Sequence, residues 1–289
     1  MSTYSQDEKE LYSEWCSKFD LARHRLLAID RQEGTQEVKR MEIVIDKEIS
    51  LNTYLKFCES EPDVIVKYCL IDGKIEAYDI PDESHATVQG QLIGIMGSWN
   101  NQLIVTGERD VIVNPRSIYR GDINVRPRHF QPQQPQRPQP SRARRHDPNL
   151  VVEIGSTESL GHLHRMVVGY FSLQTTIQLY LAIKLFPPRQ NNTFALLALL
   201  YSRNNPNPTI PIIVKSFGTA PLSVLTQNYL QNTINVPVKI ITGVGFGPVP
   251  TNPLFNGARG GVPIDMPQNF YIDLFVLQDA YQNALENTF

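Results

Sequence analysis

Two carboxylates occupy positions where an apolar strand would normally hold no charge. Glu153 lies inside the segment "DPNLVVEIGS" (147–156), whose apolar and β-branched residues predict a buried strand. Asp122 begins the short run "DINV" upstream. A carboxylate in an apolar strand is costly unless another group pairs with it or binds to it. The chemistry of both residues therefore depends on their partners.

The spacing of these two acids favours a shared cation. Residues 126–148 separate the two strands, and without that insertion the strands would be hairpin neighbours. Asp122 would then lie beside Glu153. Two converging carboxylates bind a hard divalent cation such as Mg²⁺ or Mn²⁺, which can polarise a phosphoryl oxygen and activate a water. Two alternatives stay open: Glu153 is a structural acid paired with an arginine, and Asp122 is a turn cap.

The insertion at 126–148 has the composition of an extended or disordered segment. It contains six prolines, five glutamines and six arginines, and Phe130 is its only large apolar residue. Such a segment cannot bury a core. We expect either a solvated loop or an arm that attracts phosphates through its arginines, and such a cluster can also act as a nuclear localisation patch.

The whole composition excludes some classes of protein. The net charge of −2 does not mark a nucleic-acid binder by itself, although a local basic patch is compatible with it. Three cysteines without metal-type spacing suit a reducing compartment. The start of the chain has no secretory pattern, and no apolar stretch is long enough to span a membrane. We expect an intracellular protein, in the cytoplasm or nucleus, without a membrane span; its oligomeric state stays open, a homo-oligomer included.

The surrounding elements can be placed from periodicity and turn residues. A helical pattern covers 6–30, a second helix follows the N-cap Ser50, and Asp72-Gly73 predicts a tight hairpin turn between two strands. Residues 85–99 favour a helix, and so do residues 156–172 around "GHLHR". The alternation in "TIQLYLAIKLF" predicts a strand with one buried face, and 244–268 is expected to be a loop.

Three segments carry a resemblance to a known family. They are "ISLNTYLKFCESEPDVIVKYCLIDGKIEAYDIPDESHATVQGQLIGIM", "GDINV" and "DPNLVVEIGS". In order and spacing they resemble the Uma-two family of candidate restriction endonucleases, over about residues 48–186, within the PD-(D/E)XK nuclease superfamily. The resemblance implies an α/β fold with a restriction-endonuclease-like mixed β-sheet flanked by helices. We expect this domain at 48–205, a helical N-terminal extension at 1–47 and a C-terminal αβ elaboration at 206–289.

The resemblance also implies a site. Asp122 and Glu153 would bind Mg²⁺, with the backbone carbonyl of Ile154 nearby. Three positions depart from the family pattern: Cys69 stands for a frequent glutamate, Gly155 for the lysine of the E-x-K motif, and Gly121 for the proline before the aspartate.

The helix after Glu153 offers cationic residues that could assist. Arg165 or His162 would orient the phosphate or the water, although these two and His164 could equally be ordinary helix residues. His85 resembles the helix-start histidine of the family, or it caps or packs.

Together these features predict Mg²⁺-dependent hydrolysis of phosphodiester bonds in DNA by a degenerate active site. Because the lysine and the glutamate are replaced, we expect activity to be weak or absent. One alternative is a nuclease-like module that has lost catalysis and binds nucleic acid or protein. Another is a structural protein whose C-terminal region recognises a partner.

Overall fold

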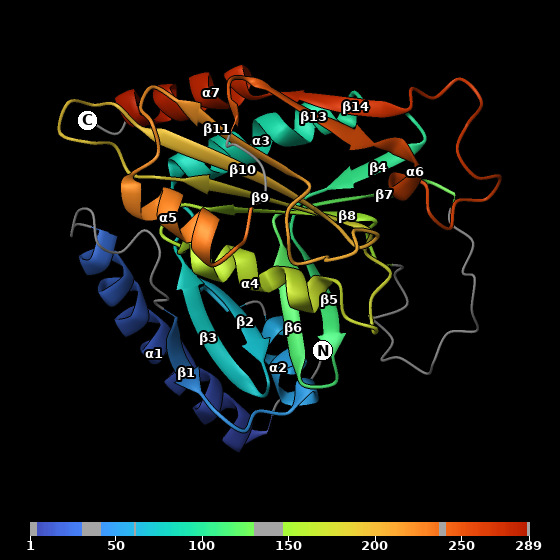
Figure 1. The fold of residues 1–289 in the computed structure, drawn as a ribbon. Coiled ribbons are helices and arrows are strands. Elements are labelled where there is room, and N and C mark those ends of the chain that lie inside the picture. The colour runs from blue at the N-terminus through green and yellow to red at the C-terminus, as the bar shows by residue number, and fades with distance from the viewer. Residues whose placement is uncertain (1–4, 31–41, 61, 130–146, 237–240, 288–289) are drawn as a thin grey trace.

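A seven-stranded sheet forms the middle layer of the fold (Figure 1). The computed structural model describes residues 5–30, 42–60, 62–129, 147–236 and 241–287; most of the insertion lies outside these ranges. The order of strands is β12-β11-β10-β9-β8-β7-β4. Only β8–β9 and β11–β12 among these neighbours are parallel. The strands are β4 (Leu103–Thr106), β7 (Ile123–Pro127), β8 (Leu150–Gly155), β9 (Leu179–Leu185), β10 (Ala195–Ser202), β11 (Ile213–Gly218) and β12 (Ile241–Thr242).

A second, five-stranded sheet lies on one side of the first (Figure 1). It is antiparallel and has the order β1-β3-β2-β6-β5. Its strands are β1 (Ile43–Asp46), β2 (Lys67–Ile71), β3 (Lys74–Asp79), β5 (Arg109–Asn114) and β6 (Ser117–Gly121). A two-stranded sheet pairs β13 (Gly245–Pro250) with β14 (Asn269–Asp273).

Seven helices lie around the sheets in the described ranges. They are α1 (Gln6–Asp30), α2 (Leu51–Glu59), α3 (Glu83–Gly97), α4 (Leu160–Tyr170), α5 (Val224–Asn232), α6 (Thr251–Leu254) and α7 (Leu274–Asn287). In Figure 1, α3 and α7 lie on one face, and α4 and α5 on the other. Helix α4 contacts both sheets, so it fills the junction between them. Within the described ranges, no helix has the length and apolarity needed to cross a bilayer.

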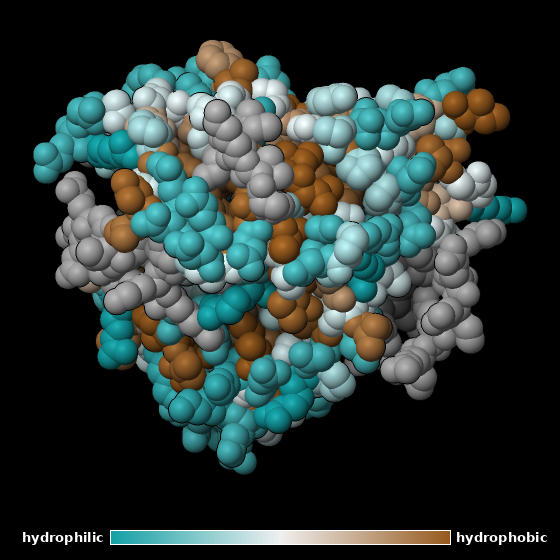
Figure 2. All heavy atoms as spheres, viewed as in Figure 1, coloured by the Kyte–Doolittle hydropathy of each residue, from teal (hydrophilic) through white to brown (hydrophobic). Residues whose placement is uncertain are grey.

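The core has an aliphatic part and an aromatic part. Leucine, isoleucine and valine side chains dominate the cluster under α3 and α7. Beneath the five-stranded sheet, α1 and α2 bury an aromatic cluster that includes Trp15, Tyr54 and Phe57. On the outside, Figure 2 shows a face where hydrophilic side chains predominate and hydrophobic ones form separate patches, as on ordinary protein surfaces. The mixed α/β class predicted from the sequence is confirmed.

Local predictions are confirmed where a cap or turn residue determines the backbone conformation. Ser50 caps α2 by accepting a hydrogen bond from the backbone N–H of Thr53. Asp72 and Gly73 have φ angles of 50° and 76°, which is the left-handed backbone that a tight hairpin turn between β2 and β3 requires. These contacts fix the hairpin that brings β2 toward the seven-stranded sheet.

Two expectations are corrected. The segment expected to be a loop at 244–268 contains β13 and α6, because its Gly/Pro-rich strand finds a partner in β14. Strand β9 is buried along its whole length, rather than on one face, since helices cover both faces of the sheet. Strand β6 was not anticipated from the sequence; it pairs β5 with β2 and completes the five-stranded sheet.

Candidate active site

Asp122 and Glu153 face each other across two adjacent strands, as the sequence predicts. In the antiparallel pairing of β7 and β8, Ile123 lies opposite Val152, which places the preceding Asp122 opposite Glu153. The backbone N–H of Asp122 donates to the Val152 carbonyl at 3.0 Å. Both carboxyl side chains are fully buried. Two buried acids on adjacent strands need positive charge nearby.

Lys67 supplies this charge from the other sheet. It is the first residue of β2 and is only 8 % exposed. Its Nζ donates to Asp122 Oδ2 at 2.9 Å and lies 3.6 Å from Glu153 Oε2. The same ammonium is 3.4 Å from the carbonyl oxygen of Ile154. Lys67 therefore lies among the very atoms that the resemblance assigns to a metal ion.

Asp79 and His85 complete this group. Asp79 ends β3, and its Oδ1 accepts hydrogen bonds from the backbone of the loop between β8 and α4, at Thr157 and Glu158. Its Oδ2 lies 3.8 Å from Lys67 Nζ. His85, in the first turn of α3, places Nε2 3.3 Å from Asp122 Oδ1. We call Lys67, Asp79, His85, Asp122 and Glu153 the inner group.

The two acids of the central pair differ in their surroundings. Burial acts to raise the pKa of Asp122, but Lys67, His85 and the Ile154 N–H together lower it to about 2. Burial raises the pKa of Glu153 well above its ordinary value, and the negative charges of Asp122 and Glu158 add to this effect against Lys67. Glu153 Oε1 accepts a hydrogen bond from the Tyr170 hydroxyl. Asp122 thus carries the charge of the pair, and Glu153 holds a proton more readily.

Lys67 remains an ammonium in this setting. Burial alone would lower its pKa, but the charges of Asp122, Glu153, Asp79 and Glu158 raise it well above the ordinary value. The Lys67 ammonium is consequently a fixed positive charge rather than a base.

The other two predicted site residues belong to a neighbouring cluster. His162 Nδ1 is hydrogen-bonded to Glu158, and Arg165 forms an ion pair with Glu42. His162 Nε2 is 3.9 Å from Glu42 Oε1. We call Glu42, Glu158, His162 and Arg165 the outer group. Since these contacts turn both cationic side chains toward their own acids, a direct role for His162 or Arg165 with a substrate stays a prediction.

The three departures from the family pattern have local explanations. A Cβ at Gly121 would lie 2.4 Å from Val151 Cγ1, so the packing of β7 on β8 excludes a larger residue there. A Cβ at Gly155 would come within 3.0 Å of Leu163 Cδ1 and 3.1 Å of Glu158 Cβ, which leaves little room for a lysine. Cys69 is buried with tyrosines of the core. The positive charge missing at Gly155 is present at Lys67 instead.

Sequence reasoning missed Lys67, although a signal was available. Lys67 interrupts the apolar run "VIVKYCLI" just as Glu153 interrupts "LVVEIG". A charge in each of two buried strands suggests that the strands supply each other's counter-ion. Asp79 was also missed. His85 resembles the helix-start histidine of the family, and the sequence left capping or packing open as the alternative.

The donor atoms of the inner group suit a hard divalent cation. Asp122 Oδ1, Glu153 Oε2 and Asp79 Oδ2 are buried and accept no hydrogen bond from any described residue. Together with the Ile154 carbonyl they are all oxygens, the ligand type that Mg²⁺ prefers. Among the described residues, however, no cluster of three or more His, Cys, Asp or Glu side chains has a metal-binding arrangement. The chemistry of the donors fits the cation, while Lys67 Nζ lies between them.

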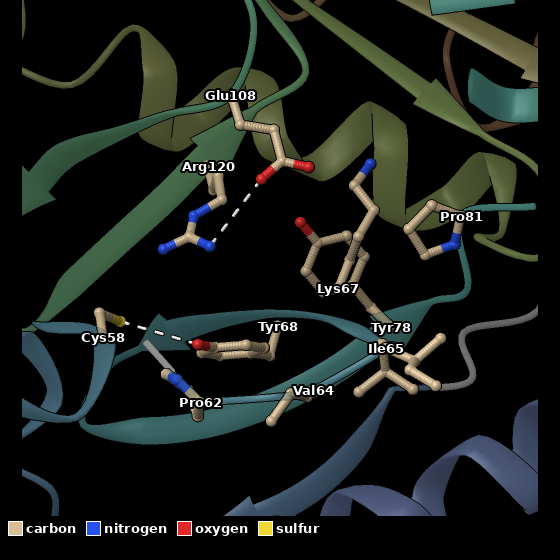
Figure 3. A pocket seen from close by; sticks show the side chains of 11 residues that line it. Cys58, Pro62, Val64, Ile65, Lys67, Tyr68, Tyr78, Pro81, Glu108 and Arg120 are labelled. Atoms are coloured by element: carbon tan, nitrogen blue, oxygen red, sulfur yellow. Dashed lines mark hydrogen bonds and ion pairs between the residues drawn. The ribbon is translucent and has the colours of Figure 1, made fainter. Parts of the chain in front are cut away.

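A pocket leads toward this group from the surface. It has a volume of about 260 Å³, and its lining includes Lys67, Tyr68, Tyr78, Glu108 and Arg120. In Figure 3, Lys67 extends beside Tyr78, and Arg120 and Glu108 come from the opposite side. The Lys67 ammonium is 5.7 Å from the centre of the Tyr78 ring. Lys67 thus belongs both to the pocket wall and to the buried inner group.

A family model identifies the family of this chain. No curated protein matches the sequence. A crystal structure described as "a putative nuclease belonging to DUF820", from Anabaena variabilis, is similar in fold with a TM-score of 0.46 and 14% sequence identity, over 81% of this chain and 99% of that chain. Residues 51–197, just over half of the chain, match the Uma2 family, described as "Putative restriction endonuclease". The chain belongs to the Uma2 family.

Proposed function

We propose that this protein hydrolyses phosphodiester bonds in DNA with a divalent cation, and that Lys67 replaces the lysine missing at Gly155. The observation that carries the proposal is the position of Lys67 Nζ, within 3.6 Å of both Asp122 and Glu153. Two acids and a lysine form the working set of a PD-(D/E)XK nuclease, which the Uma2 membership suggests. Here the lysine comes from β2 rather than from the strand of the glutamate.

The acids would hold the cation. Asp122, Glu153 and the Ile154 carbonyl offer hard oxygen donors on one side of the sheet junction. A bound Mg²⁺ or Mn²⁺ supplies Lewis acidity toward a phosphoryl oxygen and toward water.

Lys67 would stabilise negative charge on the phosphate. Its raised pKa keeps it protonated, so it cannot accept a proton from water. A fixed positive charge in a buried site stabilises developing charge strongly, because little solvent screens it. Lys67 also lines the pocket, where a phosphate could reach it.

Glu153 is the better candidate for proton transfer. Burial and the neighbouring acids raise its pKa, so its ionised carboxylate would be a stronger base toward an attacking water than that of Asp122. The Tyr170 hydroxyl, bonded to Oε1, holds the carboxyl group in place. Because Asp122 has the lower pKa and Glu153 the higher one, Asp122 would keep the negative charge and Glu153 would take the proton.

A second candidate is a binding module without catalysis. It is favoured by the complete burial of Asp122 and Glu153, since a phosphodiester cannot reach them unless the pocket wall moves. Such a protein would bind DNA in the same place and leave it intact.

Cleavage of a supercoiled plasmid in Mg²⁺ and in Mn²⁺ tests the proposal. The wild type, Asp122→Asn and Lys67→Met should be compared with Arg165→Met, a matched loss of a cation from the outer group. Nicking that is lost in the first two variants and kept in Arg165→Met supports the proposal. Binding of DNA by the wild type without any nicking supports the binding module.

A further inference from the structure

Three acidic side chains surround a single ammonium in the inner group. Three carboxylates, those of Asp79, Asp122 and Glu153, lie within 4 Å of Lys67 Nζ. One oxygen of each accepts no hydrogen bond from the described residues. Buried oxygens of this kind normally have a partner. The group is therefore built around a cation, and Lys67 occupies its centre.

A divalent cation bound to the same atoms could not coexist with Lys67 in its present position. Mg²⁺ binds oxygen ligands at about 2.0–2.1 Å and tolerates little distortion of its octahedron. Lys67 Nζ is 2.9 Å from Asp122 Oδ2 and 3.4 Å from the Ile154 carbonyl oxygen, which are two of the atoms such an ion would use. Two cations this close repel each other strongly in a buried site. One of them has to leave.

The pocket offers the displaced ammonium a place. Lys67 lines this pocket of about 260 Å³ together with the Tyr78 ring and Glu108 (Figure 3). The lysine side chain has a flexible four-carbon stem, so its head group can move while the backbone of β2 keeps its place. Glu108 offers a negative charge on the pocket side, and its only described ion-pair partner is Arg120 at 4.0 Å.

We propose that the Lys67 ammonium and a divalent cation are alternative occupants of one buried site. Without metal, Lys67 neutralises Asp122 and Glu153 and keeps the site closed. When the cation binds, Lys67 swings into the pocket, where it meets the phosphate of the substrate. This inference rests on the proposed function, because it deepens the role of the same site. It makes cation binding the step that moves Lys67 from a structural partner to a substrate-facing group.

Binding of Mn²⁺ by calorimetry at pH 8, without DNA, tests this exchange. Lys67→Met removes the competitor, so Mn²⁺ should bind about tenfold more tightly or better than to the wild type, as expected for removing one charge-assisted hydrogen bond. Mn²⁺ should also raise the melting temperature of Lys67→Met more than that of the wild type. Lys184→Met is the matched control, since Lys184 is a second buried lysine whose Nζ donates to the Ser156 carbonyl. This control should bind Mn²⁺ like the wild type.

The outcomes separate this inference from the proposed function. Equal Mn²⁺ affinity of the wild type and Lys67→Met overturns the exchange, while metal-dependent cleavage by the wild type would leave the nuclease proposal intact. Absence of both Mn²⁺ binding and cleavage in every variant overturns the two together. Should Lys67→Met fail to fold, a crystal structure of the wild type with Mn²⁺ decides the question. Mn²⁺ on Asp122 and Glu153 with Lys67 Nζ still bonded to Asp122 would overturn the exchange.

Discussion

Two clusters of buried charge lie side by side in this molecule and differ in how their charges are matched. In the outer group, Arg165 pairs with Glu42 and His162 pairs with Glu158. In the inner group, Asp79, Asp122 and Glu153 share Lys67, with His85 beside two of them. The acids are buried in both groups, since the side chains of Glu42 and Glu158 are at most 3 % exposed, but Arg165 of the outer group is 43 % exposed.

This difference shows that burial of charge does not by itself mark a functional site. Each acid of the outer group has its own basic partner, Arg165 for Glu42 and His162 for Glu158, and pairing is the usual condition for keeping a buried charge in a stable fold. The inner group leaves carboxylate oxygens without hydrogen-bond donors among the described residues. In the outer group, by comparison, one carboxylate oxygen, Glu158 Oε2, also lacks a donor among the described residues. With three such oxygens, the inner group has the greater capacity for a further positive charge. We therefore expect metal and substrate to depend on the inner group.

Loss of cleavage should be the largest effect that separates the two groups. We expect Asp122→Asn and Glu153→Gln to lower the rate of plasmid nicking by about 10²–10⁴-fold, because each removes a group that binds the cation or moves a proton. Arg165→Met should change the rate by less than about tenfold. The measurement is the initial rate of nicking in Mg²⁺ under single-turnover conditions.

The opposite pattern would reverse the assignment of the two groups. If Arg165→Met abolished nicking while the Asp122 variant remained active, the outer group would be the active site. Circular dichroism of each variant serves as the control for folding.

Stability should separate the groups next. Lys67→Met leaves the inner carboxylates without their shared ammonium, and breaking a buried pair in this way costs about 3–5 kcal/mol of the free energy of unfolding. Arg165 is 43 % exposed and pairs with one buried acid, Glu42, so Arg165→Met removes a partly solvated partner from a single acid and should cost less than Lys67→Met. Urea unfolding at pH 7 in EDTA measures both. Equal losses of unfolding free energy in the two variants would mean that Lys67 contributes no more to stability than Arg165 does.

The sequence predicts the acid pair of the inner group because local rules determine it. Strands β7 and β8 are neighbours along the chain apart from the insertion, and antiparallel pairing of neighbours sets Asp122 against Glu153. Turn and cap residues such as Ser50 and Asp72 predict their own geometry in the same way. Family resemblance supplied the roles of the acids, and the match over 51–197 confirms the family.

The sequence marks Lys67 as an unusual charge in an apolar strand, but its pairing with the acids of the inner group comes from long-range packing. Lys67 is 55 positions before Asp122 and belongs to another sheet, so only the meeting of the two sheets brings them together. The Uma2 resemblance directed attention to Gly155, next to Glu153, where the crowding of Leu163 and Glu158 leaves no space for a long side chain. The hydrophobic periodicity of a sequence does not indicate which strand will supply a counter-ion.

The pH dependence of stability should sharpen the contrast within the inner group. Burial, and after it the charges of Asp122 and Glu158, raise the folded pKa of Glu153 above the unfolded value of about 4.3. The stability linked to its proton is thus present below about pH 4.3 and is lost as pH rises through the raised folded pKa. Glu153→Gln cannot lose that proton. We expect this variant to exceed the wild type in stability at pH 8, on the order of 1 kcal/mol, and the gap to close toward pH 4.

Unfolding by urea from pH 4 to pH 9 in EDTA gives this comparison directly. A Glu153→Gln variant that is less stable than the wild type at pH 8 would mean that the ionised carboxylate is well compensated by Lys67. Glu153 would then be charged like Asp122, and a higher basicity would no longer distinguish it as the group that takes the proton.

The smallest expected effect is a shift in the pKa of His164 when Arg165, a member of the outer group, loses its charge. His164 lies next to Arg165 in α4, and its Nδ1 is 3.1 Å from the Tyr201 hydroxyl. Burial lowers the pKa of His164, and the positive charge of Arg165 lowers it further. Arg165→Met should therefore raise the pKa of His164 slightly, while burial keeps it below the ordinary value of about 6.5.

The depressed folded pKa of His164 contributes stability that is present above about pH 6.5 and is lost as pH falls through the folded pKa. The Arg165→Met variant should therefore lose slightly less stability on acidification than the wild type. Titration of the His164 ring by NMR measures the shift, with Lys74→Met, an exposed lysine of the other sheet, as the control. An unchanged pKa in Arg165→Met would mean that the guanidinium does not stay beside Glu42 and His164 in solution, and Arg165 would again be a candidate to reach the phosphate near Asp122 and Glu153.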